Sequence, residues 1–427
     1  MTKSYLKIRY FILILNCSVI PLLITGPFLS DLAVSLSGVL FLVYCGLEKK
    51  WVYFNNSFFK LFLIFYLYYL VRSIEADDIT RVLTKHVFYI RHGIFVISTM
   101  WLIEKFSNYK LFFLYTASLA LIILCADAIF QFYYGVNILG LKGGESSEIV
   151  DSEYFGRISG LFGDEYVLGS YISRLTPLVL GLSYFYFKDK KALITIIFCL
   201  FYLTVLLSGE RTSFFLINLF LVYFFIFVKG FRKHKIYLVI LISLVSLFSL
   251  NYDRQLKGRM FFYTLSQLGM DSKNSKMNFF SEMHEDHITV ALRMFKDNVF
   301  FGKGPRLYQK VCLEKFHTKT IGNNQPVCST HPHHFYFQIL AETGLVGLFF
   351  IFIIIYKIFI VLISEIKHFF RIHKSTFNNY QIILLGSFII NLFPLVPSGN
   401  IFNNWMSIIY FIPVGFILDS FKKKNDK

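Results

Sequence analysis

Long apolar stretches recur along the whole chain, and they constrain its fold more than any other feature. A helix that crosses the hydrocarbon core of a bilayer needs about 20 consecutive, mostly apolar residues. Stretches of this kind predict twelve membrane-spanning helices. They lie at residues 8–25, 30–47, 58–73, 86–103, 109–131, 165–187, 191–208, 211–228, 235–251, 334–363, 380–397 and 401–419. We therefore expect an all-α, polytopic membrane protein.

The composition excludes the soluble alternatives. Hydrophobic residues make up 56% of the 427 residues, and Phe alone occurs 52 times. Only 16% of the residues are charged, compared with about 25% in an average soluble domain. Disordered chains, collagen-like repeats, disulfide-dense secreted scaffolds and ordinary cytosolic enzymes do not have this composition.

The basic residues predict the orientation of the spans. An even number of spans places both termini on one side, and lysines and arginines concentrate in the connections expected on that side. Because basic residues are enriched in cytoplasmic connections, both termini are predicted to be cytoplasmic. The net charge of +17 also fits nucleic-acid binding, but the role of these residues in orienting helices and contacting anionic lipid favours a membrane partner and no nucleic acid.

Two segments on the outer side, 132–164 and 252–333, are too long to be simple connections. Loops of this length usually carry function or form a small subdomain. We therefore divide the chain into nine spans (1–251), an outer loop (252–333) and three spans (334–427). Cys312 and Cys328 both lie in this loop, where an oxidising compartment would allow a disulfide. Two unpaired thiols are the alternative.

The densest group of polar residues precedes the tenth predicted span and contains His331, His333 and His334. Histidine suits general base catalysis because its ordinary pKa lies near neutral pH. A zinc site that includes Cys328 or His317 is an alternative, although no His pair at helical spacing and no flanking acidic ligand supports it. The simplest alternative is that these histidines only lie at the water interface.

Three arginines belong to the same outer region. Arg157 precedes the sixth span, Arg174 lies deeper in that span, and Arg211 falls in the short turn between the seventh and eighth spans. The predicted topology places Arg157, Arg211 and His333 on one face of the membrane. Guanidinium groups suit phosphate recognition because their forked donors match phosphate oxygens. Alternatively, these arginines reach toward lipid headgroups or pair within the bundle.

Four segments together resemble the superfamily of O-antigen ligases and O-antigen polymerases. They are GRISGLFGD (156–164), SGERTS (208–213), MFKDNVFFGKGPRLY (294–308) and HHFYFQILAETGLVG (333–347). The last resembles the family hallmark, in which a histidine precedes an acidic residue, a small residue and a glycine. His333 stands in the place of that histidine. His334 replaces the Asn that often follows it, so the catalytic imidazole of the cluster is left open.

The resemblance implies an inverting, metal-independent, GT-C-like glycosyltransferase without a cofactor, in the bacterial inner membrane with its active site facing the periplasm. The donor would be a glycan on undecaprenyl pyrophosphate, and the acceptor lipid A–core or another glycan. His333 would be the general base. The residues expected to bind substrate are Arg157, Arg211, Arg174, His331, His334 and Glu342.

These expectations leave two other functions open. We prefer a ligase that attaches polysaccharide to lipid A–core, with a polymerase that joins lipid-linked repeat units as the alternative. A transporter or flippase is a more remote alternative because many carriers have twelve spans. Against it, the two halves of the chain show no similarity, and the polar clusters are expected at the outer surface.

Overall fold

The computed structural model describes residues 2–76, 78–142, 157–267, 280–315, 320–321, 325–326, 328–370 and 377–422. The described residues are almost entirely helical. The longer helices are α1 (Thr2–Ile24), α2 (Pro27–Glu48), α3 (Ser57–Ala76), α5 (Ile90–Lys105), α6 (Tyr109–Tyr134), α7 (Leu168–Phe187), α8 (Lys191–Leu207), α9 (Arg211–Phe227), α10 (Arg232–Tyr252), α13 (Glu282–Asp297), α15 (Phe335–Phe369), α16 (Asn379–Asn391) and α17 (Asn404–Lys422).

Shorter elements connect these helices. They are η1 (Trp51–Phe54), α4 (Ile79–Arg81), η2 (Val82–His86), η3 (Val87–Tyr89), η4 (Gly160–Phe162), α11 (Arg254–Lys257), η5 (Gly258–Phe262), α12 (Tyr263–Gln267) and α14 (Tyr308–Lys315). The strands β1 (Thr320–Ile321) and β2 (Gln325–Pro326) pair antiparallel, with Thr320 opposite Pro326. This two-residue pairing is the one departure from all-α structure in the described part of the chain.

Each of the twelve apolar stretches coincides with a helix. Within the described residues, eight helices are long and apolar enough to cross a membrane, and α8 and α9 are apolar helices of 17 residues. The expected span 380–397 is helical only to Asn391. Pro394 follows, and the residues before a proline are disfavoured in helical conformation, so the chain continues as an irregular segment to α17. The structure is therefore that of a multi-pass membrane protein.

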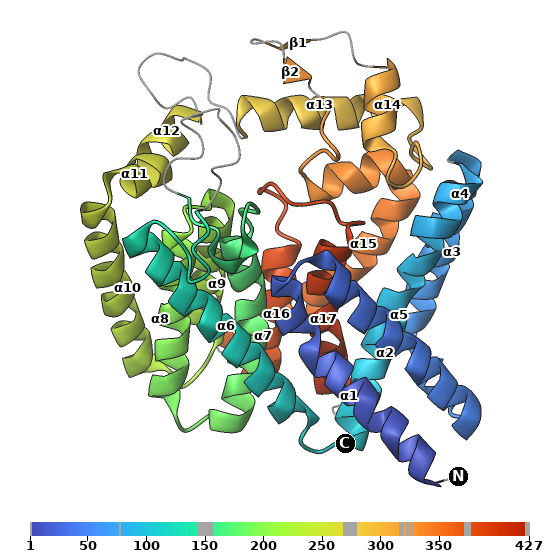
Figure 1. The fold of residues 1–427 in the computed structure, drawn as a ribbon, viewed down its shortest axis with the longest axis horizontal. Helices are drawn as coiled ribbons and strands as arrows, with labels where there is room; N and C mark the ends of the chain where they lie inside the picture. The colour runs from blue at the N-terminus through green and yellow to red at the C-terminus, as the bar shows by residue number, and fades with distance from the viewer. Residues whose placement is uncertain are drawn as a thin grey trace.

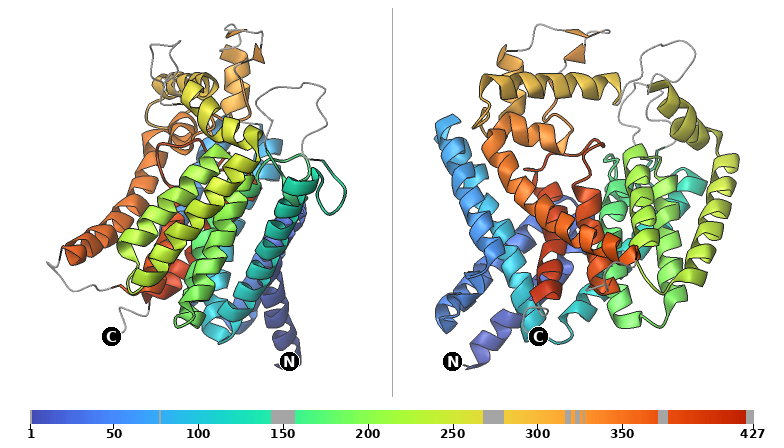
Figure 2. Two further views of the ribbon diagram at one scale, coloured as in Figure 1. Left: turned by 90° about the vertical axis from the view of Figure 1, so that its left-hand side faces the viewer. Right: turned by 180° about the vertical axis from the view of Figure 1, so that it is seen from behind.

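The long helices stand side by side as a bundle. Helix α1 begins and α17 ends at the same end of this bundle, whereas α13, α14 and the two strands cover the opposite end (Figure 1). The right-hand view of Figure 2 shows α13 lying across that covered end. The main buried cluster joins α1, α2, α5–α10, α16 and α17. Large apolar side chains such as Phe28 (74% exposed) and Leu247 (61%) lie on the outside. An apolar exterior of this kind suits lipid as solvent.

A break in α15 lies at the covered end and contacts the segment that precedes Leu307. Gly344 has φ +63° and ψ −162°, so the helical backbone is interrupted there. The segment before Leu307 packs into the break. Lys303 N–H donates to Ala341 O (2.9 Å), and Leu345 N–H donates to Val299 O (3.0 Å). A Cβ on Gly344 would lie 2.3 Å from Phe300 O. Glycine is therefore required where these two backbones meet.

Candidate active site

The histidine group of the sequence lies where the chain enters α15. His333 has φ +51°, one of three non-glycine residues with positive φ in the described residues. Its carbonyl accepts a hydrogen bond from Ser398 N–H (2.8 Å), which ties it to the irregular segment after α16. A residue held in this uncommon conformation points to a position selected for function rather than for local stability.

Three other imidazoles surround that of His333. The ring centroid of His331 lies 4.1 Å from that of His333, and those of His287 and His284 lie 5.3 and 5.8 Å away. His284 and His287 come from α13, so the covering helix contributes half of this cluster. Their i, i+3 spacing on one helical face was the sequence signal that could have identified them.

His334 faces different partners. Its Nε2 donates to Pro394 O (2.9 Å), which fixes the proton on that nitrogen because a carbonyl can only accept. Its ring also packs beside Phe337 and Phe280, with centroids 4.6 and 5.5 Å away. His334 is thus occupied in joining the start of α15 to the segment after α16, whereas His333 faces the histidine cluster.

The surroundings of His333, His331 and His284 disfavour their protonated forms. Burial lowers the pKa of His333 to about 3, and repulsion from His331, His287 and His284 acts in the same direction. Burial likewise lowers the pKa values of His331 and His284 to about 4. The positive charge of Arg211 contributes to the shift at His284, which places this arginine within electrostatic reach of the cluster. Neutral imidazoles can accept a proton.

Arg157 lies near a buried carboxylate that sequence reasoning missed. Glu210 precedes α9, and its Oε1 and Oε2 accept hydrogen bonds from Gly169 N–H (2.6 Å) and Ser170 N–H (3.1 Å) at the start of α7. Burial raises the pKa of Glu210, and the charge of Arg157 acts in the opposite direction. The acidic neighbour of the turn arginine was visible in SGERTS, but its partners on α7 were not.

Arg157 itself is held by the loop that precedes α7. Its guanidinium donates to Tyr166 O (2.9 Å) and lies over the Tyr166 ring, 4.5 Å from the centroid. Arg174 is buried in α7, one turn after Ser170. It donates to Asn391 Oδ1 (2.8 Å) and Ser170 Oγ (3.2 Å). The described contacts of Arg174 are therefore with the bundle.

Glu342 is fully buried and holds the segment that fills the break in α15. Its carboxylate accepts hydrogen bonds from Arg306 N–H (3.0 Å), Tyr308 N–H (3.3 Å) and Gln338 Nε2 (3.3 Å). These contacts suit a positioning residue better than the substrate contact expected from the sequence. Cys312 and Cys328 form a disulfide with Cα atoms 5.6 Å apart, which ties α14 to the residues just before His331.

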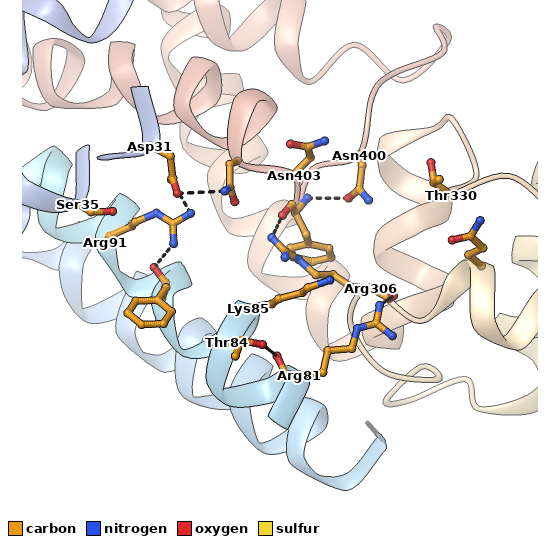
Figure 3. Close-up of a pocket in the computed structure, with 14 residues that line it drawn as sticks. Asp31, Ser35, Arg81, Thr84, Lys85, Arg91, Arg306, Thr330, Asn400 and Asn403 are labelled. Atoms are coloured by element: carbon orange, nitrogen blue, oxygen red, sulfur yellow. Dashed lines mark hydrogen bonds and ion pairs between the residues drawn. The ribbon is translucent and has the colours of Figure 1, made fainter. Parts of the chain in front are cut away.

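A separate pocket of about 520 Å³ lies beside the histidine cluster and is strongly basic. Arg81, Lys85, Arg91 and Arg306 line it, together with a single acidic residue, Asp31 (Figure 3). These residues come from segments distant in sequence, so no motif indicated their convergence. Among the residues that the structure describes, no group of three or more His, Cys, Asp or Glu side chains is arranged to hold a metal ion. His317, invoked in the zinc alternative, lies outside those residues.

A comparison with protein families finds a match in part of the chain. Residues 195–352 match the family model described as O-antigen ligase. This segment contains Arg211, both cysteines of the disulfide, the four clustered histidines and Glu342, whereas Arg157 and Arg174 precede it. No curated protein matches the chain. The match confirms the resemblance seen in the motifs and supports the assignment of this chain to the superfamily of O-antigen ligases and O-antigen polymerases.

Proposed function

We propose that the protein is an O-antigen ligase that transfers a glycan from undecaprenyl pyrophosphate to a sugar hydroxyl of lipid A–core. The observation that carries this proposal is the position of His333 beside His331, His287 and His284, inside the segment that matches the O-antigen ligase family. Of these residues, His284 lies within electrostatic reach of Arg211. A glycosyl transfer from a pyrophosphate needs a base for the acceptor and positive charge for the leaving group.

In the proposed reaction His333 accepts the proton of the acceptor hydroxyl while its oxygen attacks the anomeric carbon. The bond from that carbon to the pyrophosphate oxygen breaks, and the pyrophosphate leaves with the bonding electrons. A single displacement of this kind inverts the anomeric carbon. Arg211 and Arg157 compensate the charge of the leaving group, so the step needs no metal.

The low pKa of His333 makes its basicity depend on whether the donor is bound. Burial and the adjacent imidazoles disfavour the protonated form in the free protein. A pyrophosphate bound beside Arg211 would bring negative charge into the cluster, and a nearby negative charge raises the pKa of a histidine. Donor binding would therefore increase the basicity of His333, and the base would be strongest when both substrates are in place.

The proposal also includes the membrane setting. In this proposal the protein is a GT-C-like bundle of twelve spans in the bacterial inner membrane, with both termini cytoplasmic and the histidine cluster facing the periplasm. The lipid tail of the donor would lie between spans. Support comes from the position of α13 and α14 at the end of the bundle opposite the start of α1 (Figure 1), together with the basic residues of the predicted cytoplasmic connections.

A lipopolysaccharide gel from a deletion strain tests this function, with the wild-type gene, His333→Ala, Arg211→Ala or the control His234→Ala restored. His234 lies in α10, far from the cluster in the chain. Loss of long glycan from lipid A–core, with polymerised glycan accumulating on the undecaprenyl carrier, is expected for the deletion and the first two variants. A lipid A–core that carries a single repeat unit would identify a polymerase instead, and normal transfer in His333→Ala would contradict the mechanism.

A further inference from the structure

The pocket beside the histidine cluster has more basic than acidic residues in its lining. It contains four basic residues and one acidic residue. The carboxylate of Asp31 pairs with Arg91 (2.6 Å) and also accepts a hydrogen bond from Asn404 Nδ2 (3.1 Å). The carboxylate therefore pairs with Arg91, and it forms no ion pair with Lys85 or Arg306.

Lys85 and Arg306 both have hydrogen-bond donors without a protein acceptor in the described residues. Lys85 makes no hydrogen bond or ion pair with any residue in the described part of the chain. The guanidinium of Arg306 donates to the Phe402 carbonyl, while its Nε is buried without a hydrogen-bond partner. Figure 3 shows Arg81, Lys85 and Arg306 gathered on one side of the pocket and the pair of Asp31 and Arg91 on another. Lys85 is exposed, whereas a buried donor without an acceptor, such as Arg306 Nε, is unfavourable unless a ligand satisfies it.

The backbone of Arg306 is held in an uncommon conformation. Its φ is +60°, a region that residues with a Cβ seldom adopt. Hydrogen bonds fix it from both sides, because Arg306 N–H donates to Glu342 Oε2 (3.0 Å) and Arg306 O accepts from Arg81 (2.9 Å). The protein thus maintains a strained backbone at the residue whose side chain lines the pocket, as it does at His333.

The pocket reaches the histidine cluster from a side different from that of Arg157 and Arg211. Thr330 lines the pocket and its Oγ1 contacts His331 Nδ1 (3.0 Å), and His331 in turn adjoins His333. Part of the pocket wall comes from α2, α4, η2 and α5, whereas Arg211 begins α9, on the other side of the bundle (Figure 1). A general base must lie within hydrogen-bond reach of the acceptor hydroxyl, and that hydroxyl must also face the anomeric carbon of the donor.

We infer that this pocket binds an anionic group, a phosphate or carboxylate, carried by the glycan acceptor. The inference rests on the proposed function, because it takes the arginines near α7 and α9 to be the donor side of His333. Lys85, Arg306 and Arg81 would hold the anionic group by charge-assisted hydrogen bonds. The acceptor sugar would then extend past Thr330, with its hydroxyl presented to His333.

A binding experiment tests the pocket independently of catalysis. The thermal unfolding midpoint of the full-length protein in detergent is measured against increasing inorganic phosphate. Wild type and the control Lys310→Gln should be stabilised by phosphate, since Lys310 is an exposed residue of α14 outside the pocket. Lys85→Gln and Arg306→Gln should lose most of this stabilisation, and Lys85→Arg should keep it. Equal stabilisation of wild type and Lys85→Gln would overturn the site, whether or not the protein has transferase activity.

A kinetic experiment identifies which substrate carries the anion. With purified lipid-linked donor and lipid A–core, Lys85→Gln should raise the acceptor KM about tenfold or more, while kcat and the donor KM stay near wild type. Dephosphorylated and carboxyl-reduced acceptors show which group is bound, because the difference between wild type and Lys85→Gln should vanish with one of them. An increase confined to the donor KM would assign the pocket to the donor and overturn the inference. Absence of transfer by wild type would instead contradict the proposed function.

Discussion

Replacement of Glu342 by Ala should destabilise the covered end of the protein by removing the acceptor for its loop. Arg306 N–H and Tyr308 N–H donate to this carboxylate at 3.0 and 3.3 Å, and the Glu342 side chain has no exposed surface. A buried donor left without an acceptor costs about 1–3 kcal/mol, so the loss of acceptors for two donors would cost about 2–6 kcal/mol in total. Glu342→Gln keeps one carbonyl oxygen and should cost about half as much.

The assay is thermal unfolding of the purified protein in one detergent, followed in parallel by glycan transfer. Both Glu342 variants should lower the unfolding midpoint, with Ala below Gln, and transfer should fall because Arg306 and the segment before it are no longer held. Glu314→Ala is the control, because Glu314 is an exposed residue of α14 at the same end of the molecule. A Glu342→Ala protein with a wild-type midpoint but no transfer would refute this reasoning, and it would favour the direct substrate contact expected from the sequence.

Three further predictions concern stability in the same assay. Acidification from about pH 6.5 toward pH 4 should lower the midpoint, because the pKa values of His284, His331 and His333 in the folded protein lie below their ordinary value of 6.5 and the unfolded chain takes up protons first. His284→Asn should flatten this profile, and an unchanged slope would contradict the assignment. Gly344→Ala should lower the midpoint more than Gly163→Ala, since both glycines have φ +63° but only Gly344 has backbone atoms in the space a Cβ would fill; equal losses would show that backbone strain alone matters. Cys312→Ser should cost about 3 kcal/mol, and a reductant should lower the wild-type midpoint but leave that of the variant unchanged.

The helices of this fold were predictable because a membrane-spanning helix can be recognised in a sequence by its length and apolar composition. The end of α16 was not, since the apolar run continues past Asn391 while Pro394 ends the helix. Nor was the break at Gly344, because a glycine in an apolar run reads as a tolerated helical residue until another backbone is known to approach it.

The candidate site was predictable in part for a related reason. His333, Arg157 and Arg211 stood in recognisable motifs, and His331 lies two residues before one of them. The partners of these residues come from elsewhere in the chain and were invisible to motif reading, including His287 on α13 and the basic side chains of the pocket. Spacing along a sequence indicates which residues share one helical face, but it does not tell which loops fold over that face.

The break in α15 has a consequence for how this protein can be engineered. In a lipid environment the backbone groups freed at Gly344 have no water to bond with, so the bonds from Val299, Phe300 and Lys303 must take that role. The outer loop and the tenth predicted span therefore form one structural unit, although the sequence suggests two separate segments. A chimera that exchanges acceptor specificity between related enzymes should carry residues 298–346 together. A boundary drawn at the membrane surface would separate the two backbone segments that hydrogen-bond to each other at the break.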